Sequence, residues 1–525
     1  MDVGAALITT GRKNILDNID RVEKDYHLPL GVQSRRDPAY NYSYYEMRGL
    51  TLENIDEHIA YAKKGGFRIM VIYWWDFAES CGHFIWKKEY PNGLDDLKLI
   101  ADKIRSAGII PGFHIHYNKA TKNDPYVTPT PDTRLNLTGI FTLKESVGPT
   151  ETEIVIEENP RMCTMEDGRR ILKLGDELIE YENYTTTPPY KFTGCKRGIL
   201  NTTSQYAKKG LKIGLLDVDT WPLFIRFDQR TDIQQEVAER LAKIINETGV
   251  RFVYFDGAED VHPPYWYYGS KAQLDLYNLL NPKPLVSEGA FKTHFSWHVL
   301  TRANAYDLFK PEQLREGVRK YMLPGAKYMA ESFTAINFGW NLYSVDMQPD
   351  MYEYVCSRGA GWNAPISLGV VRIEQLRTHP RTEDNLEVMK NWEEARIAGF
   401  FTEEQKNSLK DPYQEHILIK NEKGVFELFP YQKTDIAGNS ADVTAYTFQR
   451  NYQTWVIYWH TKGNAQIQIP VKAEQVALFD KTGVRTELKQ NSKEYSTFPV
   501  DNRRFLVFDL PEQEVNNLLA KSKII

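Results

Sequence analysis

Acidic residues stand at the points where short apolar runs of this sequence end. The run Phe252–Phe255 passes directly into Asp256, and Glu259 and Asp260 follow within four residues. Such a run is typical of a buried parallel strand, and in α/β proteins the carboxyl ends of parallel strands carry the chemistry. Asp256 is therefore the first candidate for a catalytic carboxylate. Its structural alternative is the N-cap of a following helix.

The same pattern recurs along the chain. The acids at predicted strand ends are Asp76, Asp256, Glu288, Asp307 and Glu331. Carboxylates gathered at one mouth repel one another, so stability alone does not require them. Hydrolysis of a glycosidic bond does require two, because one must stay ionised while the other holds a proton for the leaving oxygen. The nearby Trp75 and Trp297 are candidates for the wall of a sugar site, since indole faces stack on sugar rings.

Strand and helix patterns alternate around these acids. The predicted strands are Leu28–Ser34, Phe67–Trp75, Ile109–His116, Phe252–Phe255, Pro284–Glu288, Ala303–Asp307, Ala326–Glu331 and Ala364–Val371. Helical spacing is found in Arg12–Tyr26, Thr51–Ala62, Leu94–Ala107, Asp232–Asn246, Met351–Arg358 and the stretch Glu374–Lys410. Eight strands joined by connections long enough to hold helices predict a (β/α)8 TIM barrel of the α/β class.

Two β-rich regions accompany the predicted barrel. After the third strand the alternation stops for about a hundred residues, which is too long for a loop and indicates an inserted domain. From about Val443, alternating runs indicate an antiparallel β-sandwich. We therefore expect four segments along the 525 residues. They are an N-terminal lead with the first part of the barrel (1–125), a small inserted β domain (126–225), the rest of the barrel with the catalytic residues (226–410), and the C-terminal sandwich (411–525).

Composition narrows the class of partner. The net charge is -5 with both signs interspersed, which disfavours nucleic acid and anionic membranes. The sequence contains no run of 18 apolar residues, so it predicts no membrane span. The four scattered cysteines favour free thiols over a zinc module or a disulfide scaffold, although Cys163 and Cys195 fall in one segment. The N-terminus lacks a leader pattern, so we expect a cytoplasmic protein, or a periplasmic or secreted one if a leader has been removed.

Four histidines keep a metal-dependent hydrolase as an alternative to the glycosidase. His114 and His116 alternate on a predicted strand, and His294 and His298 have helical spacing, so that together with Asp256 they are candidates for the metal site of a hydrolase. Barrels of that kind usually place a His-x-His pair on the first strand, and none is present there. We therefore expect no metal and no cofactor, and assign His116 to hydrogen bonding with substrate.

Several passages occur in a familiar order. They are Tyr90–Leu94, Ile100–Phe113, Tyr254–Asp256, Ser287–Gly289, Trp297, Thr301–Asp307, Gln348–Tyr354 and Ala364–Gly369. In this order the chain resembles a distant member of the α-galactosidase (melibiase) clan of retaining glycosidases, which have a TIM barrel. The resemblance covers the barrel and not the insertion.

The resemblance implies roles for individual residues. Asp256 falls where the clan has its nucleophile, Asp307 where it has its acid/base, and Asp76 and Arg302 would contact substrate. Two departures limit the match. Tyr254 replaces a lysine that contacts sugar hydroxyls, which puts galactose in doubt. The interval from Arg302 to Asp307 is one residue longer than expected, which leaves Glu288 and Glu331 as rival acids.

Together these observations predict a retaining α-glycosidase that acts on an oligosaccharide or polysaccharide of a plant or host glycan by double displacement. The alternatives are a metal-dependent barrel hydrolase and a non-catalytic glycan-binding protein. The expected catalytic residues are Asp256 and Asp307. The expected substrate contacts are Trp75, Asp76, His116, Tyr254, Glu288, Trp297, Arg302 and Glu331.

Overall fold

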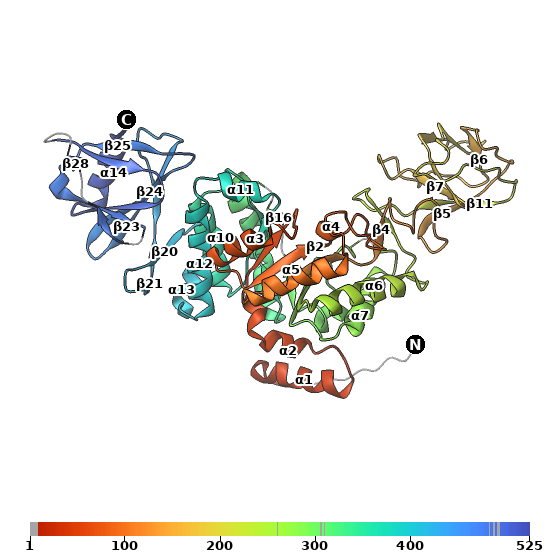
Figure 1. Ribbon diagram of the computed structural model, residues 1–525, viewed down its shortest axis with the longest axis horizontal. Helices are drawn as coiled ribbons and strands as arrows, with labels where there is room; N and C mark the ends of the chain where they lie inside the picture. Colours follow the sequence, from red (N-terminus) through yellow and green to blue (C-terminus); the bar gives the residue numbers. More distant parts are fainter. Residues whose placement is uncertain are drawn as a thin grey trace.

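The computed structural model describes residues 9–259, 261–304, 307–308, 310–481, 483–486, 489–490 and 494–525. Asp260 and the two residues between Asn304 and Asp307 lie outside these ranges. A barrel occupies the centre of the molecule, with a β-rich insertion on one side and a β-rich C-terminal region on the other (Figure 1). Of the helices in these ranges, none has both the length and the apolar character that crossing a membrane needs. The four cysteines are buried free thiols.

The barrel has eight parallel strand positions. We call each position a stave, because two of them consist of two separate strand segments. The staves are β1 (Tyr44–Met47), β2 (Ile69–Tyr73), β3 (Ile110–His116), β13 (Phe252–Asp256), β14 (Val286–Gly289), β15 with β16 (Arg302–Asn304, Asp307–Leu308), β17 with β18 (Ala335–Asn337, Trp340–Leu342) and β19 (Ser367–Val370). The sixth and seventh staves are each broken into two segments. Because β15 pairs with β17, β16 with β18, β18 with β19, and β19 with β1, the sheet closes on itself. The predicted TIM barrel is confirmed.

Two of the predicted strands are wrong. Leu28–Ser34 leads into a helix, α2 (Gly31–Arg36), and the first stave is the four-residue β1. Ala326–Glu331 belongs to a helix, α9 (Leu323–Glu331), and the seventh stave follows it as β17 and β18. A short apolar run does not distinguish a strand from a turn or two of buried helix, because both bury it equally well.

Helices cover the outside of the barrel. They are α3 (Ile55–Lys64), α5 (Leu94–Ser106), α6 (Ile233–Thr248), α7 (Tyr265–Leu279), α8 (Leu314–Gly317), α9, α10 (Pro349–Gly361), α11 (Ile373–Thr378), α12 (Thr382–Ile397) and α13 (Glu403–Leu409), with the short α4 (Trp74–Phe77) at the end of β2. Two N-terminal helices, α1 (Ile15–Asp25) and α2, lie below the barrel in Figure 1. They lie beside the N-terminal ends of the staves, since Arg35 of α2 donates from Nε to the carbonyl of Phe333, just before β17.

The staves bury both faces, as their nearly continuous apolar runs predict. One face packs against the helices in the main core. The other fills the barrel with a smaller cluster that includes Tyr44, Val71, Phe252 and Trp340. Gly112 makes room inside, because a Cβ at this position would lie 2.8 Å from the ring of Phe252.

The insertion leaves the barrel directly after β3. Its two ends pair as an antiparallel stalk, β4 (Lys119–Thr121) with β12 (Phe224–Arg226). Beyond the stalk are β5 (Leu137–Thr142), β6 (Ile154–Val155), β7 (Ile171–Leu174), β8 (Glu177–Glu180), β9 (Asn183–Tyr184), β10 (Lys191–Thr193) and β11 (Lys212–Leu216). They form two small antiparallel sheets, β5-β11-β7-β8 and β6-β10-β9, around a hydrophobic core separate from that of the barrel.

The C-terminal region is antiparallel throughout its described pairings. A hairpin, β20 (His416–Lys420) and β21 (Phe426–Pro430), leads from α13 into two facing sheets. The first sheet holds β22 (Gln432–Thr434), β23 (Val443–Arg450), β24 (Gln453–His460), β30 (Arg504–Phe508), β26 (Val476–Asp480) and β27 (Arg485–Thr486). The second holds β28 (Lys489–Gln490), β29 (Ser496–Val500), β25 (Ala465–Ile469) and β31 (Lys523–Ile524), and α14 (Glu512–Ala520) packs beside them. Both sheets contribute to one core, which makes this region a sandwich.

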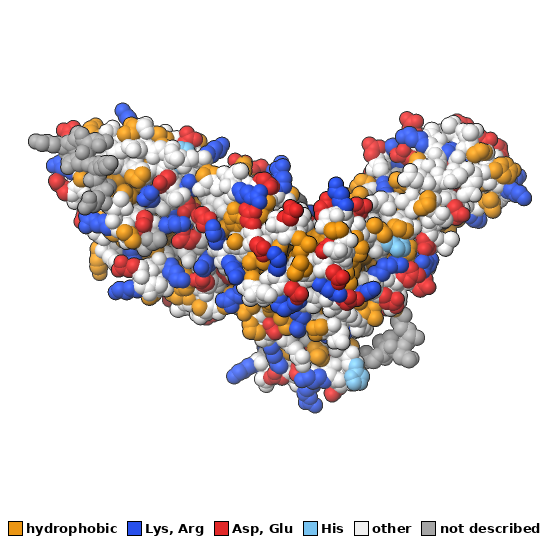
Figure 2. All heavy atoms as spheres, in the orientation of Figure 1, with side chains coloured by type: hydrophobic (Ala, Val, Ile, Leu, Met, Phe, Trp, Pro, Cys, Tyr) orange, Lys and Arg blue, Asp and Glu red, His pale blue; other side chains and the backbone are white. Residues whose placement is uncertain are grey.

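The surface is hollowed between the insertion and the C-terminal sandwich (Figure 2). The hollow lies on the side of the barrel where Figure 1 labels α4 and β16. Since α4 follows β2 directly and β16 ends the sixth stave, this is the end at which the carboxyl ends of the strands open. We call this end the mouth of the barrel.

Candidate active site

Asp256 ends the fourth stave beside two histidines of the neighbouring stave β3. The register pairs Tyr254 with His114 and Asp256 with His116. Alternate residues of a strand face the same side, so both histidines point into the barrel. Oδ2 of Asp256 lies 3.1 Å from Nε2 of His116 and 3.5 Å from Nε2 of His114. The Asp256 side chain keeps 27% of its surface exposed, so the carboxylate opens to the mouth.

A tryptophan fixes the proton on His116. The indole Nε1 of Trp74 lies 2.6 Å from Nδ1 of His116. An indole N–H can only donate, so Nδ1 must accept. A protonated imidazole has no accepting nitrogen, so this contact requires a neutral His116 with its single proton on Nε2, and burial lowers the pKa of His116 in the same direction. That proton is donated to Asp256.

These contacts hold Asp256 in its ionised form. Burial by itself opposes ionisation, but His116, His114 and Lys119 outweigh it and hold the pKa of Asp256 well below its usual range. Gly257, the residue after Asp256, leaves room for the side chain of Lys119. A Cβ on Gly257 would lie 2.6 Å from Nζ of Lys119, and the backbone there has a φ of +86°, which favours glycine.

Asp307 begins β16 and is the second carboxyl of the mouth. Nδ2 of Asn304 donates to its Oδ1 at 3.1 Å. Burial raises the pKa of Asp307, and the negative charge of Asp256 raises it further, against the opposing effects of Asn304 and Arg48. The two carboxyl groups therefore share one electrostatic environment and are shifted in opposite directions.

One aromatic residue links the strands that bear these two acids. Trp340 is the register partner of Asp307. The ring of Trp340 lies 5.1 Å from that of Tyr254 and 5.0 Å from that of His114, which contacts Asp256. Trp340, Tyr254 and His114 thus form a floor of packed rings between the two acids.

Sequence analysis missed a third carboxyl of the mouth, Glu46 on β1. Its side chain faces the barrel interior and is 1% exposed. Burial raises the pKa of Glu46 to about 8, although Arg48 opposes this from 3.5 Å. The guanidinium of Arg48 lies over the ring of Tyr73, 4.1 Å from its centroid. The only available signal was the alternation Tyr44, Glu46, which is too short to distinguish from a turn.

The predicted contacts of the second stave have different surroundings. Both oxygens of Asp76 accept backbone N–H groups, from Gly49 at 2.7 Å and from Tyr73 at 3.4 Å. Asp76 therefore helps to cap α4, and burial raises its pKa to about 7. Trp75 is half-buried beside Trp221, a residue of the insertion that the sequence did not single out.

Glu288 and Arg302 lie beneath the mouth and not in it, which corrects their assignment as substrate contacts. They form an ion pair of 2.9 Å and neither side chain is exposed. Glu288 also accepts from Tyr44 at 3.1 Å and from Asn337 at 3.0 Å. With these partners Glu288 is part of the buried polar network of the barrel floor.

Two further residues that the sequence predicts as substrate contacts are buried. Tyr254 is 2% exposed, and its ring stacks on that of His114 at 4.7 Å. His116 is 1% exposed and binds Asp256. Tyr254 lies on the same strand as Asp256, and His116 lies on the neighbouring strand β3.

Trp297 and Glu331 lie at the other end of the barrel. The indole of Trp297 donates to the carbonyl of Ser332 at 2.8 Å, and Arg35 covers its ring at 3.6 Å. Glu331 ends α9, the helix that leads into the N-terminal end of β17. Both therefore lie away from the mouth, and the site that we propose includes neither Trp297 as a sugar contact nor Glu331 as a rival acid.

The two members of the second histidine pair, His294 and His298, have different partners. His298 binds Glu23 of α1 at 2.7 Å, and the ring of His294 stacks on that of Trp266. Within the described ranges, no group of three or more His, Cys, Asp or Glu side chains is arranged to hold a metal ion.

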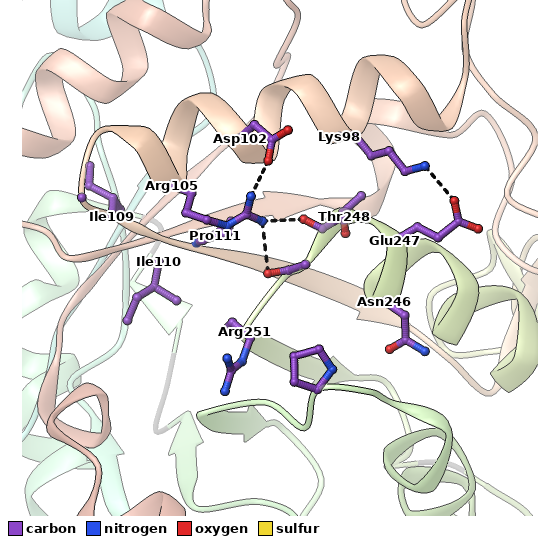
Figure 3. Close-up of a pocket in the computed structure, with 13 residues that line it drawn as sticks. Lys98, Asp102, Arg105, Ile109, Ile110, Pro111, Asn246, Glu247, Thr248 and Arg251 are labelled. Atoms are coloured by element: carbon purple, nitrogen blue, oxygen red, sulfur yellow. Dashed lines mark hydrogen bonds and ion pairs between the residues drawn. The ribbon is translucent and has the colours of Figure 1, made fainter.

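A different pocket, of about 590 Å³, opens where β3 and β13 begin (Figure 3). Four of its charged residues form ion pairs within the pocket. Lys98 binds Glu247 at 2.8 Å, and Arg105 binds Asp102 and the carbonyl of Thr248. Because β3 and β13 begin here, the pocket lies at the end of the barrel opposite the mouth.

Comparison with known proteins gives remote structural similarities only. No family model and no curated protein matches the chain. It is similar to an α-amylase from Geobacillus thermoleovorans, with 8% identity, a TM-score of 0.40, and coverage of 89% of this chain and 98% of that one. It is also similar to a GH27 β-L-arabinopyranosidase from Geobacillus stearothermophilus, with 11% identity, a TM-score of 0.38, and coverage of 90% and 99%. At this distance the activity has to be argued from the chain's own residues.

Proposed function

We propose that the protein is a retaining glycoside hydrolase in which Asp256 is the nucleophile and Asp307 the general acid and base. The observation that carries the proposal is the opposite displacement of two pKa values at one mouth, that of Asp256 downward and that of Asp307 upward. Two carboxyls whose environments drive their pKa values apart are suited to the two roles that glycosidic hydrolysis needs.

The chemistry follows in two displacements. Asp256 attacks the anomeric carbon and forms a covalent glycosyl ester, while Asp307 gives its proton to the departing oxygen. Asp307, now a carboxylate, then takes a proton from water. The resulting hydroxide breaks the ester, so that the sugar leaves with its original anomeric configuration and both acids return to their starting states.

Trp74 and His116 position the nucleophile. Because Trp74 keeps the His116 proton on Nε2, that proton always points at Asp256. A carboxylate held by a fixed donor loses little orientation when it attacks. The same hydrogen bond stabilises the charge of Asp256, which favours rapid departure of the sugar in the second step.

The class of sugar in the substrate is also part of the proposal. The resemblance of the barrel passages favours an α-galactoside-like substrate from a plant or host glycan, with Asp256 and Asp307 at the clan's two catalytic positions. Tyr254, which replaces the clan's lysine, is buried under His114 and so cannot reach sugar hydroxyls. We therefore include other α-linked pyranosides in the test.

The test compares Asp256→Asn with Asp307→Asn on aryl α-glycosides whose leaving groups differ in acidity. Asp256→Asn should lose at least about a hundredfold in kcat/KM on every substrate. Asp307→Asn should lose as much in kcat/KM on substrates with poor leaving groups. It should lose far less on 2,4-dinitrophenyl glycosides, because dinitrophenolate leaves without being protonated. NMR of the first product should give the anomer of the substrate.

Other outcomes would contradict the proposal in distinct ways. Inhibition by a chelator with rescue by a divalent metal would favour the metal-dependent hydrolase. Binding of glycans by the unaltered protein without turnover of any glycoside would favour the non-catalytic binder. If Glu46→Gln and not Asp307→Asn shows the dependence on leaving group, the acid is Glu46.

A further inference from the structure

The base of the insertion presents an indole to solvent beside Asp256. Trp221 lies between β11 and β12, and 45% of it is exposed. Its ring centroid lies 6.0 Å from that of His116, the residue that binds the nucleophile. Exposing so large an apolar surface is unfavourable, so its position next to the mouth indicates a binding role.

The turn that carries Trp221 is held rigidly. Oδ1 of Asp219 accepts from the backbone N–H of Trp221 at 2.8 Å, and the backbone N–H of Asp219 donates to the carbonyl of Phe224 at 3.0 Å. The other oxygen of Asp219 binds Lys119 at 2.9 Å and lies 3.5 Å from Arg226. These ionic side chains are nearly fully buried.

Lys119 connects this turn to the nucleophile. It lies on the outgoing strand of the stalk, pairs with Asp219 on the returning segment, and is one of the charges that lower the pKa of Asp256. The insertion is therefore tied to the mouth through its own stalk. A loosely attached appendage would not need a buried ion pair at this place.

Trp221 and Trp75 together form a corner. Their ring centroids are 5.1 Å apart and their planes meet at 80°. Trp75 comes from the end of β2 and Trp221 from the insertion, so the corner joins the two parts of the chain. Phe224 lies behind it, with its ring 5.2 Å from that of Trp221. One indole face can stack on a sugar ring while the other limits its lateral position.

We propose that this corner is a second sugar subsite, which holds the pyranose next to the one whose anomeric carbon faces Asp256. The inference rests on the proposed hydrolase function and goes beyond it, because it makes the insertion part of the substrate site. The substrate is then at least a disaccharide, and the insertion determines which neighbouring sugar is accepted.

The test compares one sugar with two. The single-sugar probes are α-D-galactosyl, α-D-glucosyl and N-acetyl-α-D-galactosaminyl fluoride, whose leaving group is too small to reach the corner. The two-sugar probe is the α-linked disaccharide of whichever glycosyl group is cleaved. Trp221→Ala should lower kcat/KM on the disaccharide by at least about tenfold more than on the fluoride, mainly through KM. Trp221→Phe should restore part of the loss.

A matched control comes from the same insertion. Tyr206 is also an exposed aromatic residue, 61% exposed, and it lies between β10 and β11, beyond the stalk. Tyr206→Ala should leave both rates unchanged. Binding supplies a second readout that does not need turnover. In an Asp256→Asn background, calorimetry should show the disaccharide binding at least about tenfold more weakly when Trp221→Ala is added.

The outcomes separate the two proposals. Equal losses on fluoride and disaccharide, or none on either, would overturn the subsite while the hydrolase stands. If the unaltered protein cleaves none of the three fluorides and its Asp256→Asn variant binds none of the three corresponding α-linked disaccharides, the hydrolase proposal itself fails.

Discussion

The two ends of the barrel use charge in opposite ways. At the end shown in Figure 3, Lys98 and Glu247 form a partly exposed ion pair, and Arg105 and Asp102 form another. At the mouth, Asp256 is held by a neutral histidine, and nearby carboxyls are buried with raised pKa values. Exposed pairs contribute little to stability and can be lost without consequence.

The difference separates a surface whose charged residues only pair with one another from one whose carboxyl groups are suited to acid and base chemistry. Burial of Glu46 and Asp307 raises their pKa values although Arg48 opposes the shift, so the presence of these carboxyls at a strand mouth requires an explanation other than stability. The pocket of Figure 3 lies at the other end of the barrel, so a pocket by itself does not mark this mouth. The direction in which the pKa values move points to this end.

The largest expected effect concerns the floor under the mouth. Glu288→Gln leaves the charge of Arg302 buried without its partner and should cost about 3–5 kcal/mol of stability. Thermal unfolding followed by tryptophan fluorescence measures this. The double variant Glu288→Gln/Arg302→Met should recover part of the loss, because no unpaired charge remains. A single variant as stable as the unaltered protein would show that the floor is not under electrostatic control.

The next effect is a pH dependence of stability that comes from Glu46. Its folded pKa of about 8 lies above the ordinary 4.5, so the folded state binds the proton more tightly than the unfolded chain. The stabilisation is full below pH 4.5 and is lost as the pH rises to about 8. Its size is up to a few kcal/mol.

Glu46→Gln removes the titrating group and nearly keeps the shape of the side chain. The melting temperature of the unaltered protein should therefore fall more between pH 5 and pH 9 than that of the variant. Parallel curves for the two proteins would show that Glu46 is ionised in the folded state.

A smaller effect is expected from the residue that fixes the histidine proton. Trp74→Phe should lower kcat about tenfold, because His116 can then turn its lone pair toward Asp256. The pKa of Asp256 should rise, which moves the acid limb of the kcat/KM profile to higher pH. Trp392→Phe is the control, since Trp392 is also buried and donates to Glu353 at 2.6 Å, away from the mouth. If both variants shift the profile equally, Trp74 has only a packing role.

The smallest effect is expected at the opposite end. Lys98→Met breaks the ion pair with Glu247, whose members are both solvated. The melting temperature should change by no more than about 1 °C, and kcat should not change. A large loss of activity would contradict the contrast between the two ends and give the pocket of Figure 3 a function.

How far the sequence predicted the barrel depended on the stave. β3 and β13 were predicted within a residue or two, because they are long and apolar. β1 was missed because it is four residues long and contains a glutamate. The seventh stave was missed because it is broken at Phe338 and Gly339. The apolar end of α9 took its place in the prediction.

The sequence by itself determined the alternation of strands and helices, the interruption after β3, and the position of Asp256 at the end of a buried strand. These are local properties, carried by periodicity and by the residue that ends each run. Only the tertiary structure decided which acids share the mouth. Closing the barrel removed Glu331, buried Glu288 against Arg302, and brought Glu46 and Trp221 into the neighbourhood of Asp256. The physical reason is that a pKa depends on desolvation and on charges a few ångströms away, and those neighbours come from distant parts of the chain.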